Sequence, residues 1–260
     1  MEVNHTHTVV KMAHKYESEH GKTEVILPEE FKCHMALFLD EEANKFPPAR
    51  GDGDHKIVLM DTAPTRFNCK IYPLSRDEQD AENKFIDKNL EKGYIVVSDS
   101  PYGFSTFMVP KKDSKEKRYI INYRPLNAVT RKDVTPLPNL KQCIENLQGM
   151  ELFSKFDIRW GYNNIRIREG DQWKAAFKTR RGLFKPKVMF FGMSNSPASF
   201  QRFMNGILEE LYEHFEKKGI LEIWCILQNY IDNCGIGTLL KDRKLHLEII
   251  HFVTHGLCVL

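Results

Sequence analysis

The sequence has no apolar run that approaches the roughly 18–20 residues needed for a membrane-spanning helix. Its first residues lack both an apolar stretch and a small-residue cleavage site, so we expect no signal peptide. The six cysteines are scattered and none forms a CxxC pair, which excludes a zinc ribbon and disfavours a disulfide framework. We therefore expect an intracellular protein, cytoplasmic or nuclear, with reduced thiols and no membrane partner.

The composition is 42% hydrophobic and 28% charged over 260 residues, which is typical of a globular protein. The net charge of +3 hides an asymmetry along the chain. Residues 108–187 hold 19 Lys and Arg against 8 Asp and Glu, whereas residues 1–107 hold 13 against 19 and residues 188–260 hold 6 against 8. The basic middle segment suits a surface that follows phosphates, although a solvated lysine-rich face would have the same composition.

Three segments carry clear local signals. Ser75-Arg76-Asp77-Glu78 is a capping box that begins a helix, and Gly93 is suited to end it. Thr106–Val109 and Arg118–Tyr123 are apolar strands joined by a charged linker, which predicts a β-hairpin with a basic tip. Ser196-Pro197 begins a long helix whose apolar residues recur at helical spacing.

Two aspartates lie at the ends of strands that are far apart in the sequence. Asp157 closes the strand predicted over Phe153–Ile158; Asp232 follows the strand predicted in Ile220–Ile231, and a turn is predicted over Asn233–Gly235. Nucleotide joining uses two divalent ions about 3.5–4 Å apart that carboxylates bridge. Both aspartates could serve Mg²⁺, which prefers oxygen ligands. Taken alone, an aspartate at a strand end is more often a turn or cap residue.

Other residues suit a nucleotide site. Lys111 and Arg118 flank the tip of the hairpin and could clamp a triphosphate. Tyr162 could stack under a sugar ring and exclude a 2′-hydroxyl. The small polar loop between Gly192 and Pro197 could approach a base pair closely. Each pattern also has a simpler interpretation, namely a solvated hairpin, a tyrosine packed in the core, and an ordinary helix entry.

Four stretches in order resemble one known family. They are FMVPKKDSKEKRYIINYRPLN, the long stretch TPLPNLKQCIENLQGMELFSKFDIRWGYNNIRIREGDQWKAAFKTRRGLF, MFFGMSNSPASFQRFMN and NYIDN. Together with the lead-in CKIYPLSRDEQDAENKFIDKNLEKGYIVVSDSPYGFSTFMV, they resemble the reverse transcriptase of gypsy-type long-terminal-repeat retrotransposons. The likeness covers roughly residues 28–260.

The resemblance implies an α+β fold, the right-hand polymerase: a palm of antiparallel sheet packed on helices, with a fingers subdomain and the thumb missing. The fingers would be about residues 70–150 with part of 160–190, and the palm most of the rest. The implied division is a polar N-terminal tail (residues 1–27), a lead-in segment (28–69), and fingers and palm (70–260) truncated before the primer grip and thumb.

The resemblance also assigns roles to single positions. Asp157 and Asp232 match the metal-binding aspartates, and Asn233 completes the catalytic motif. The positions that match dNTP contacts are Lys111, Arg118, Tyr162, Phe191, Gly192 and Gln201. The positions that match template contacts are Arg124 and Asn127.

The implied function is RNA-directed DNA polymerase, with two Mg²⁺ or Mn²⁺ ions as cofactors and dNTPs and an RNA or DNA template-primer as partners. Two substitutions, together with the truncation before the primer grip and thumb, depart from the family and favour an alternative, a decayed retroelement fragment that only binds nucleic acid. Asn233 stands where the family usually has a third aspartate, and Asn122 where an aspartate commonly precedes the Tyr-Arg pair. The rest of a retroelement polyprotein (thumb, RNase H and integrase) is expected to be absent.

Overall fold

The chain forms two compact units in a computed structural model. Unit 1 comprises residues 1–45, 136–160 and 201–260, and unit 2 comprises residues 46–135 and 161–200. The structure describes residues 14–17, 23–26, 32–33, 35, 45–110, 117–139, 141–142, 145, 148–158, 160–217, 226–230, 233–238 and 247–251.

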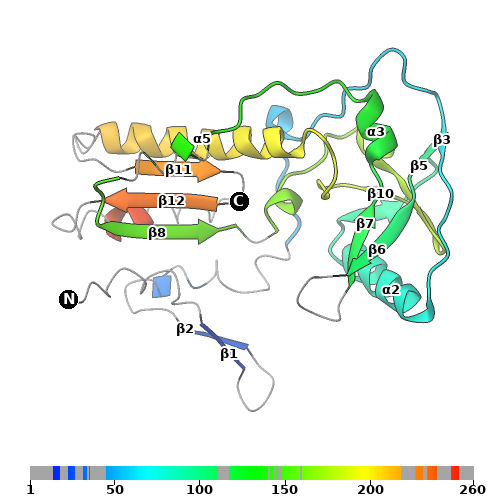
Figure 1. Cartoon of the computed structure of the whole chain (residues 1–260), viewed down its shortest axis with the longest axis horizontal. Coiled ribbons are helices and arrows are strands. Elements are labelled where there is room, and N and C mark those ends of the chain that lie inside the picture. Colours follow the sequence, from blue (N-terminus) through cyan, green and yellow to red (C-terminus); the bar gives the residue numbers. More distant parts are fainter. Residues whose placement is uncertain are drawn as a thin grey trace. The chain divides into compact units, whose positions relative to one another are not determined.

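Unit 1 contains a three-stranded antiparallel sheet in the order β11-β12-β8 (Figure 1). The strands are β8 (Leu152–Asp157), β11 (Ile226–Tyr230) and β12 (Asn233–Thr238). The turn predicted over Asn233–Gly235 is wrong, because these residues pair with β8 on one side and β11 on the other. Two further strands, β1 (His14–Glu17) and β2 (Thr23–Ile26), form an antiparallel pair within the predicted polar tail.

Unit 2 is built on short strands. β4 (Ile95–Val97), β10 (Gly182–Pro186) and β9 (Phe177–Thr179) form one antiparallel sheet in that order. β6 (Thr106–Pro110) and β7 (Lys117–Ile121) form the predicted hairpin, and β3 (Phe67–Asn68) pairs in parallel with β5 (Tyr102–Gly103). Large aromatic side chains fill the core of this unit, among them Tyr102, Phe104, Tyr123 and Phe177.

Both predicted helix starts are confirmed. α2 (Arg76–Glu91) begins with the predicted capping box at Ser75 and ends just before Gly93, whose φ is +68°. α5 (Ser196–Lys217) is the predicted long helix and begins at Ser196, whose buried Oγ has no hydrogen-bond partner among the described residues. The short α3 (Arg124–Val129) was not predicted, because it has six residues and no side-chain cap.

The segment before residue 70 is part of unit 2 from Phe46 onward. Its backbone bonds to later segments through His55 N to Arg166 O (2.8 Å) and Met60 N to Val129 O (2.8 Å). Asp171 Oδ2 also accepts a hydrogen bond from Ile57 N (3.0 Å). The part of the predicted lead-in segment from Phe46 to Cys69 therefore lies in unit 2.

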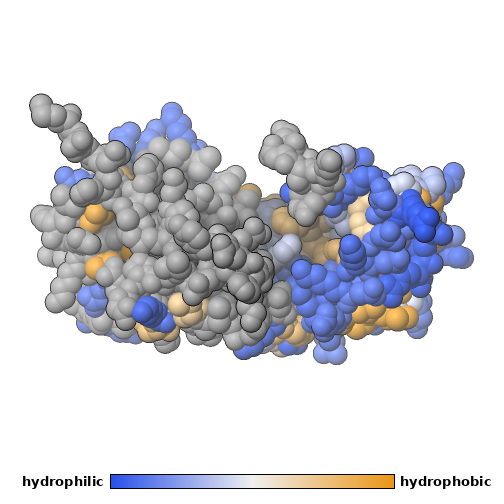
Figure 2. Space-filling model, turned by 90° about the horizontal axis from the view of Figure 1, so that it is seen from below, coloured by the Kyte–Doolittle hydropathy of each residue, from blue (hydrophilic) through white to orange (hydrophobic). Residues whose placement is uncertain are grey.

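Unit 2 holds 24 Lys and Arg against 15 Asp and Glu, whereas unit 1 holds 14 against 20. On the face that Figure 2 shows, the described residues are largely hydrophilic, with hydrophobic residues confined to small patches. No helix in the described parts combines the length and apolar character that crossing a bilayer demands. By the charge counts of the two units, the basic charge predicted for the middle of the sequence belongs mainly to unit 2.

Candidate active site

The end of β8 and the start of β12 lie side by side in the unit 1 sheet. Asp157, the last residue of β8, is the Cα partner of Asn233, the first residue of β12. Asn233 is also paired with Tyr230, the last residue of β11. Opposed residues of an antiparallel pair have Cα atoms about 4.5–5.5 Å apart. The fold therefore brings together two of the three predicted catalytic positions, which are 76 residues apart in sequence.

Two predicted site residues lie outside the described residues. They are Asp232, which precedes Asn233 in the chain, and Lys111 at the predicted hairpin tip. Their roles stay predictions. The remaining predicted nucleotide and template residues, apart from Gln201, belong to unit 2.

Tyr162 lies in a 3-10 helix, η5 (Gly161–Asn164), and is half-buried. Its ring meets Phe191 at 5.0 Å and 68° and Phe200 at 5.7 Å and 88°, both edge-on. Phe200 is fully buried, whereas Phe191 is 58% exposed. Tyr162 therefore packs on the buried Phe200. Its ring also contacts the exposed ring of Phe191, which is likewise predicted to bind nucleotide.

Gly192 needs to be a glycine because its φ is +101°, a conformation that residues with a Cβ rarely adopt. A Cβ there would lie 3.6 Å from Ile121 O and 3.7 Å from Tyr123 Cδ2, so space is not the obstacle. Burial raises the pKa of Tyr123 well above its ordinary value, and its hydroxyl donates to Ala175 O at 3.0 Å. Gly192 thus lies beside the buried ring of Tyr123.

Asn127 holds this loop with both ends of its amide. Its Nδ2 donates to Gly192 O at 2.7 Å, and its Oδ1 accepts from Ser194 N at 2.9 Å. Asn195 makes a second tie to the chain after α3, because its Nδ2 donates to Arg131 O at 2.9 Å and its Oδ1 accepts from Asp133 N at 3.2 Å. Asn127 was predicted to contact template, and in the structure its amide fastens the loop before α5. Sequence spacing gave no signal for this network, since the partners are over 60 residues apart.

The remaining predicted residues differ in accessibility. Arg118 on β7 and Arg124 at the start of α3 are exposed, as a phosphate contact requires. Gln201 is 1% exposed, and its Nε2 donates to Asn205 Oδ1 at 2.9 Å along α5. A nucleotide contact by Gln201 stays a prediction that its burial does not favour.

The donor chemistry of the β8–β12 end fits a divalent metal. The register pairs an aspartate with an asparagine, and both residue types have hard oxygen donors of the kind that Mg²⁺ prefers. Among the described residues no group of three His, Cys, Asp or Glu side chains forms a metal cluster. The metal-binding roles of Asp157 and Asp232 stay predictions.

Comparison with protein families matches residues 109–257 to the family described as reverse transcriptase (RNA-dependent DNA polymerase). The chain belongs to the reverse transcriptase family. The match extends over more than half of the chain and includes β7, α3, β8, α5 and the β11–β12 pair. Every element that carries a predicted site residue thus lies within this reverse transcriptase domain or begins just before it.

Known relatives of the reverse transcriptase domain include the Transposon Tf2-3 and Tf2-7 polyproteins of Schizosaccharomyces pombe (strain 972 / ATCC 24843). Each is 37% identical over 187 residues, which is 72% of this chain. The chain spans only 14% of the length of these relatives.

Solved structures confirm the predicted α+β fold of a polymerase palm and fingers. Prototype Foamy Virus Protease-Reverse Transcriptase matches with a TM-score of 0.71 at 20% identity, over 87% of this chain and 28% of that chain. A foamy viral protease-reverse transcriptase in complex with dsDNA matches with a TM-score of 0.70 at 18% identity, over 87% of this chain and 44% of that chain.

Proposed function

We propose that this domain is an RNA-directed DNA polymerase of the gypsy-type retrotransposon class, which adds dNTPs to a primer. The observation that carries the proposal is the β8–β12 register, with Asp157 directly opposite Asn233. Asp232 is the chain neighbour of Asn233, and its place in the site rests on that adjacency. Membership of the reverse transcriptase family supports the reaction class.

The two compact units support the predicted subdomains. Unit 2, with the hairpin and the net positive charge, corresponds to the fingers, and unit 1, with the β11-β12-β8 sheet, corresponds to the palm. The fingers then begin near residue 46 rather than residue 70, because the lead-in from Phe46 bonds to the rest of unit 2. Residues 1–45 fall in unit 1.

Asp157 and Asp232 would hold two Mg²⁺ or Mn²⁺ ions, which supply charge neutralisation for the phosphoryl group and its leaving pyrophosphate when bound. Arg118 and Lys111 would hold the triphosphate, Arg118 by a planar fork and Lys111 as a point charge. The ring of Tyr162, which packs on Phe200, would stack under the sugar ring of the nucleotide beside Phe191. Arg124 and Asn127 would lie along the template, with Asn127 also holding the Gly192 loop.

Asn233 decides how much activity to expect. It keeps an oxygen donor but lacks the charge of an aspartate. A cost of roughly 3–4 kcal/mol at the transition state would slow the reaction on the order of a hundred- to a thousand-fold. Weak incorporation is therefore the expected activity, and Asn233→Asp should raise its rate.

The proposed partners are dNTPs and an RNA or DNA template-primer. One structural relative is titled as a complex with dsDNA, and the sequence relatives are transposon polyproteins, which supports both a duplex substrate and an origin within a larger chain. The net positive charge of unit 2 supports the proposal that the chain binds nucleic-acid phosphates, with an affinity that falls as the salt concentration rises.

The test is extension of a labelled primer on RNA by one complementary dNTP, with Mg²⁺ or Mn²⁺, at high enzyme concentration. Slow metal-dependent extension that Asn233→Asp accelerates would support the polymerase. The alternative, a fragment that only binds nucleic acid, is favoured by Asn233 itself. It predicts salt-dependent binding of the primed RNA with no extension by either form.

A further inference from the structure

Glu82 is a buried carboxyl group that the proposed reaction does not use. It is 2% exposed and comes from the middle of α2. Its Oε1 accepts a hydrogen bond from the Tyr119 hydroxyl at 3.1 Å, and Thr106 Oγ1 lies 3.4 Å away. Thr106 Oγ1 is also 3.2 Å from Lys178 O, so its one proton serves either acceptor. Because Tyr119 is on β7 and Thr106 on β6, one carboxyl oxygen meets both strands of the hairpin.

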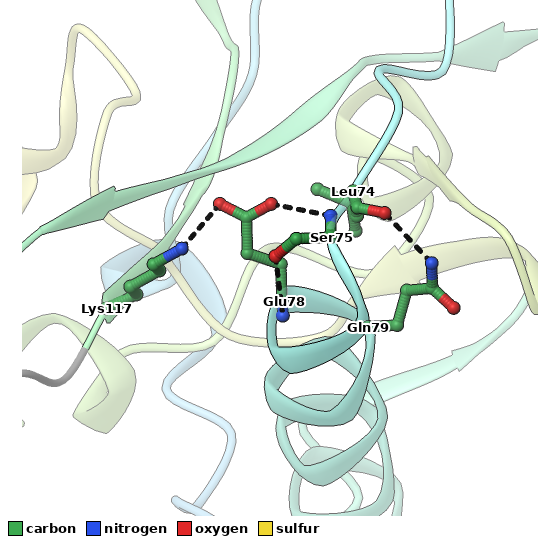
Figure 3. A network of polar contacts seen from close by, with 5 residues as sticks. All are labelled: Leu74, Ser75, Glu78, Gln79 and Lys117. Carbon is green, nitrogen blue, oxygen red and sulfur yellow. Dashed lines mark hydrogen bonds and ion pairs between the residues drawn. The ribbon is translucent and has the colours of Figure 1, made fainter.

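The same face of α2 makes two more contacts with β7. Glu78, Glu82 and Phe85 are spaced four and three residues apart, which places them along one side of a helix. The ring of Phe85 stacks on Tyr119 at 4.2 Å and 26°. Glu78 accepts from Ser75 N through Oε2 and pairs with Lys117 Nζ at 2.9 Å through Oε1 (Figure 3). The cap of α2 is thereby tied to the first residue of β7.

These contacts determine which face of the hairpin Arg118 occupies. Lys117 and Tyr119 are two residues apart on β7 and both contact α2. Side chains alternate between the faces of a strand, so Arg118, between them, is on the opposite face and is exposed. Burial raises the pKa of Tyr119 well above its ordinary value, so its hydroxyl keeps the proton that it donates in this contact.

We infer that Glu82 is a positioning residue: it fixes the β6–β7 hairpin on α2 so that Arg118 faces a bound triphosphate. This inference rests on the proposed function for the role of Arg118, although the link between α2 and the hairpin stands on its own geometry. Loss of the carboxyl group would remove the hydrogen bond that joins the Tyr119 hydroxyl to the middle of α2, so the hairpin would lose a polar contact with that helix.

The experiment uses the full chain with Glu82→Met and Glu82→Gln, and Glu91→Met as the same change at an exposed position of α2. The dissociation constant of a dNTP is measured by calorimetry, and KM and kcat by single-nucleotide extension. Glu82→Met is expected to raise the dNTP dissociation constant and KM about tenfold and leave kcat within about twofold. Glu82→Gln, which keeps an acceptor oxygen, and Glu91→Met are expected to stay within about twofold of the unchanged chain.

Arg118→Ala separates positioning from general stability. If Glu82 acts through Arg118, adding Glu82→Met to Arg118→Ala should raise the dNTP dissociation constant no further. A full tenfold addition in that background, or a Glu82→Met chain that binds dNTP normally, would overturn the inference.

Amide hydrogen exchange of residues 106–110 and 117–121 gives a measure that needs no activity. Glu82→Met should speed exchange there, while Glu82→Gln should not. If the unchanged chain binds no dNTP yet Glu82→Met still speeds this exchange, the proposed function fails and the α2–hairpin link holds. If exchange in the hairpin is unchanged by Glu82→Met, the link itself is refuted.

Discussion

At the residue scale, the loop before α5 depends on Gly192 and on the amide of Asn127. Gly192 adopts a φ of +101°, and Asn127 bonds both Gly192 and Ser194. Phe191, one position earlier, touches the ring of Tyr162. The backbone conformation at Gly192 therefore bears on where the ring of Phe191 lies beside Tyr162.

Gly192→Ala should destabilise the chain by about 1–3 kcal/mol, because alanine is strained at this φ. Gly206 is the matched control, because it lies inside α5 and a Cβ added there would meet nothing within 4 Å. Gly206→Ala should stabilise by about 0.5–1 kcal/mol, since a helical glycine loses more backbone entropy than alanine. Urea unfolding of both variants checks the pair, and equal stability of Gly192→Ala and the unchanged chain would contradict the account.

At the element scale, the candidate active site depends on the pairing of β8 with β12. It joins segments whose sequence separation is long, and β12 contains Gly235 and Gly237, residues that favour turns over strands. The sequence consequently predicted a turn where pairing on both sides makes a strand. Sequence patterns predicted elements correctly where the residues involved are close in the sequence, as in the Ser75 capping box and the β6–β7 hairpin.

The register can be tested by replacing Asp157 and Asn233 together with cysteine (Asp157→Cys, Asn233→Cys). Opposed positions are within the Cα distance that a disulfide spans, roughly 4.4–6.8 Å. Mild oxidation should link the two sites, detected by mass spectrometry of the digested chain. The combination of Asp157→Cys with Ile236→Cys, three positions further along β12, should not link, and preferential linkage of that pair would show a different register.

The contact of the α2 cap with β7 makes a pH-dependent contribution. The hydrogen bond from Lys117, then the backbone bond from Ser75, lowers the pKa of Glu78 below its ordinary value. A carboxyl whose pKa is lower in the folded state stabilises above its unfolded pKa of about 4.3 and loses that contribution as the pH falls through the folded value. The unchanged chain should therefore have a higher Tm than Glu78→Gln at pH 7, and the gap should shrink by pH 3.

Thermal melts of Glu78→Gln, Lys117→Gln and the double variant at both pH values check this contribution. The double variant should lose little more than either single variant at pH 7, because the two changes remove one shared contact. If the Tm difference between the unchanged chain and Glu78→Gln grew toward pH 3, the predicted sign of the pH dependence would be wrong.

At the scale of the whole molecule, the sequence predicted the fold better than the detail of the site. Ordered motifs implied a polymerase fold, and the TM-score of 0.71 to a foamy virus reverse transcriptase confirms it. Motifs could not show that Asn127 holds the Gly192 loop, that Gln201 is buried, or that residues from Phe46 onward belong to unit 2. Those features arise from contacts between distant segments, for which a single sequence carries no periodic signal.

The most direct test of the central claim is the effect of Asp157→Ala on single-nucleotide extension of a primed RNA at saturating dNTP and Mn²⁺. The chain with Asn233→Asp serves as the parent, because its rate should be easier to measure. Asp157→Ala should abolish extension while the salt dependence of RNA binding stays as in the parent. Extension at the parental rate in Asp157→Ala would contradict the assignment of the β8–β12 end as the catalytic centre.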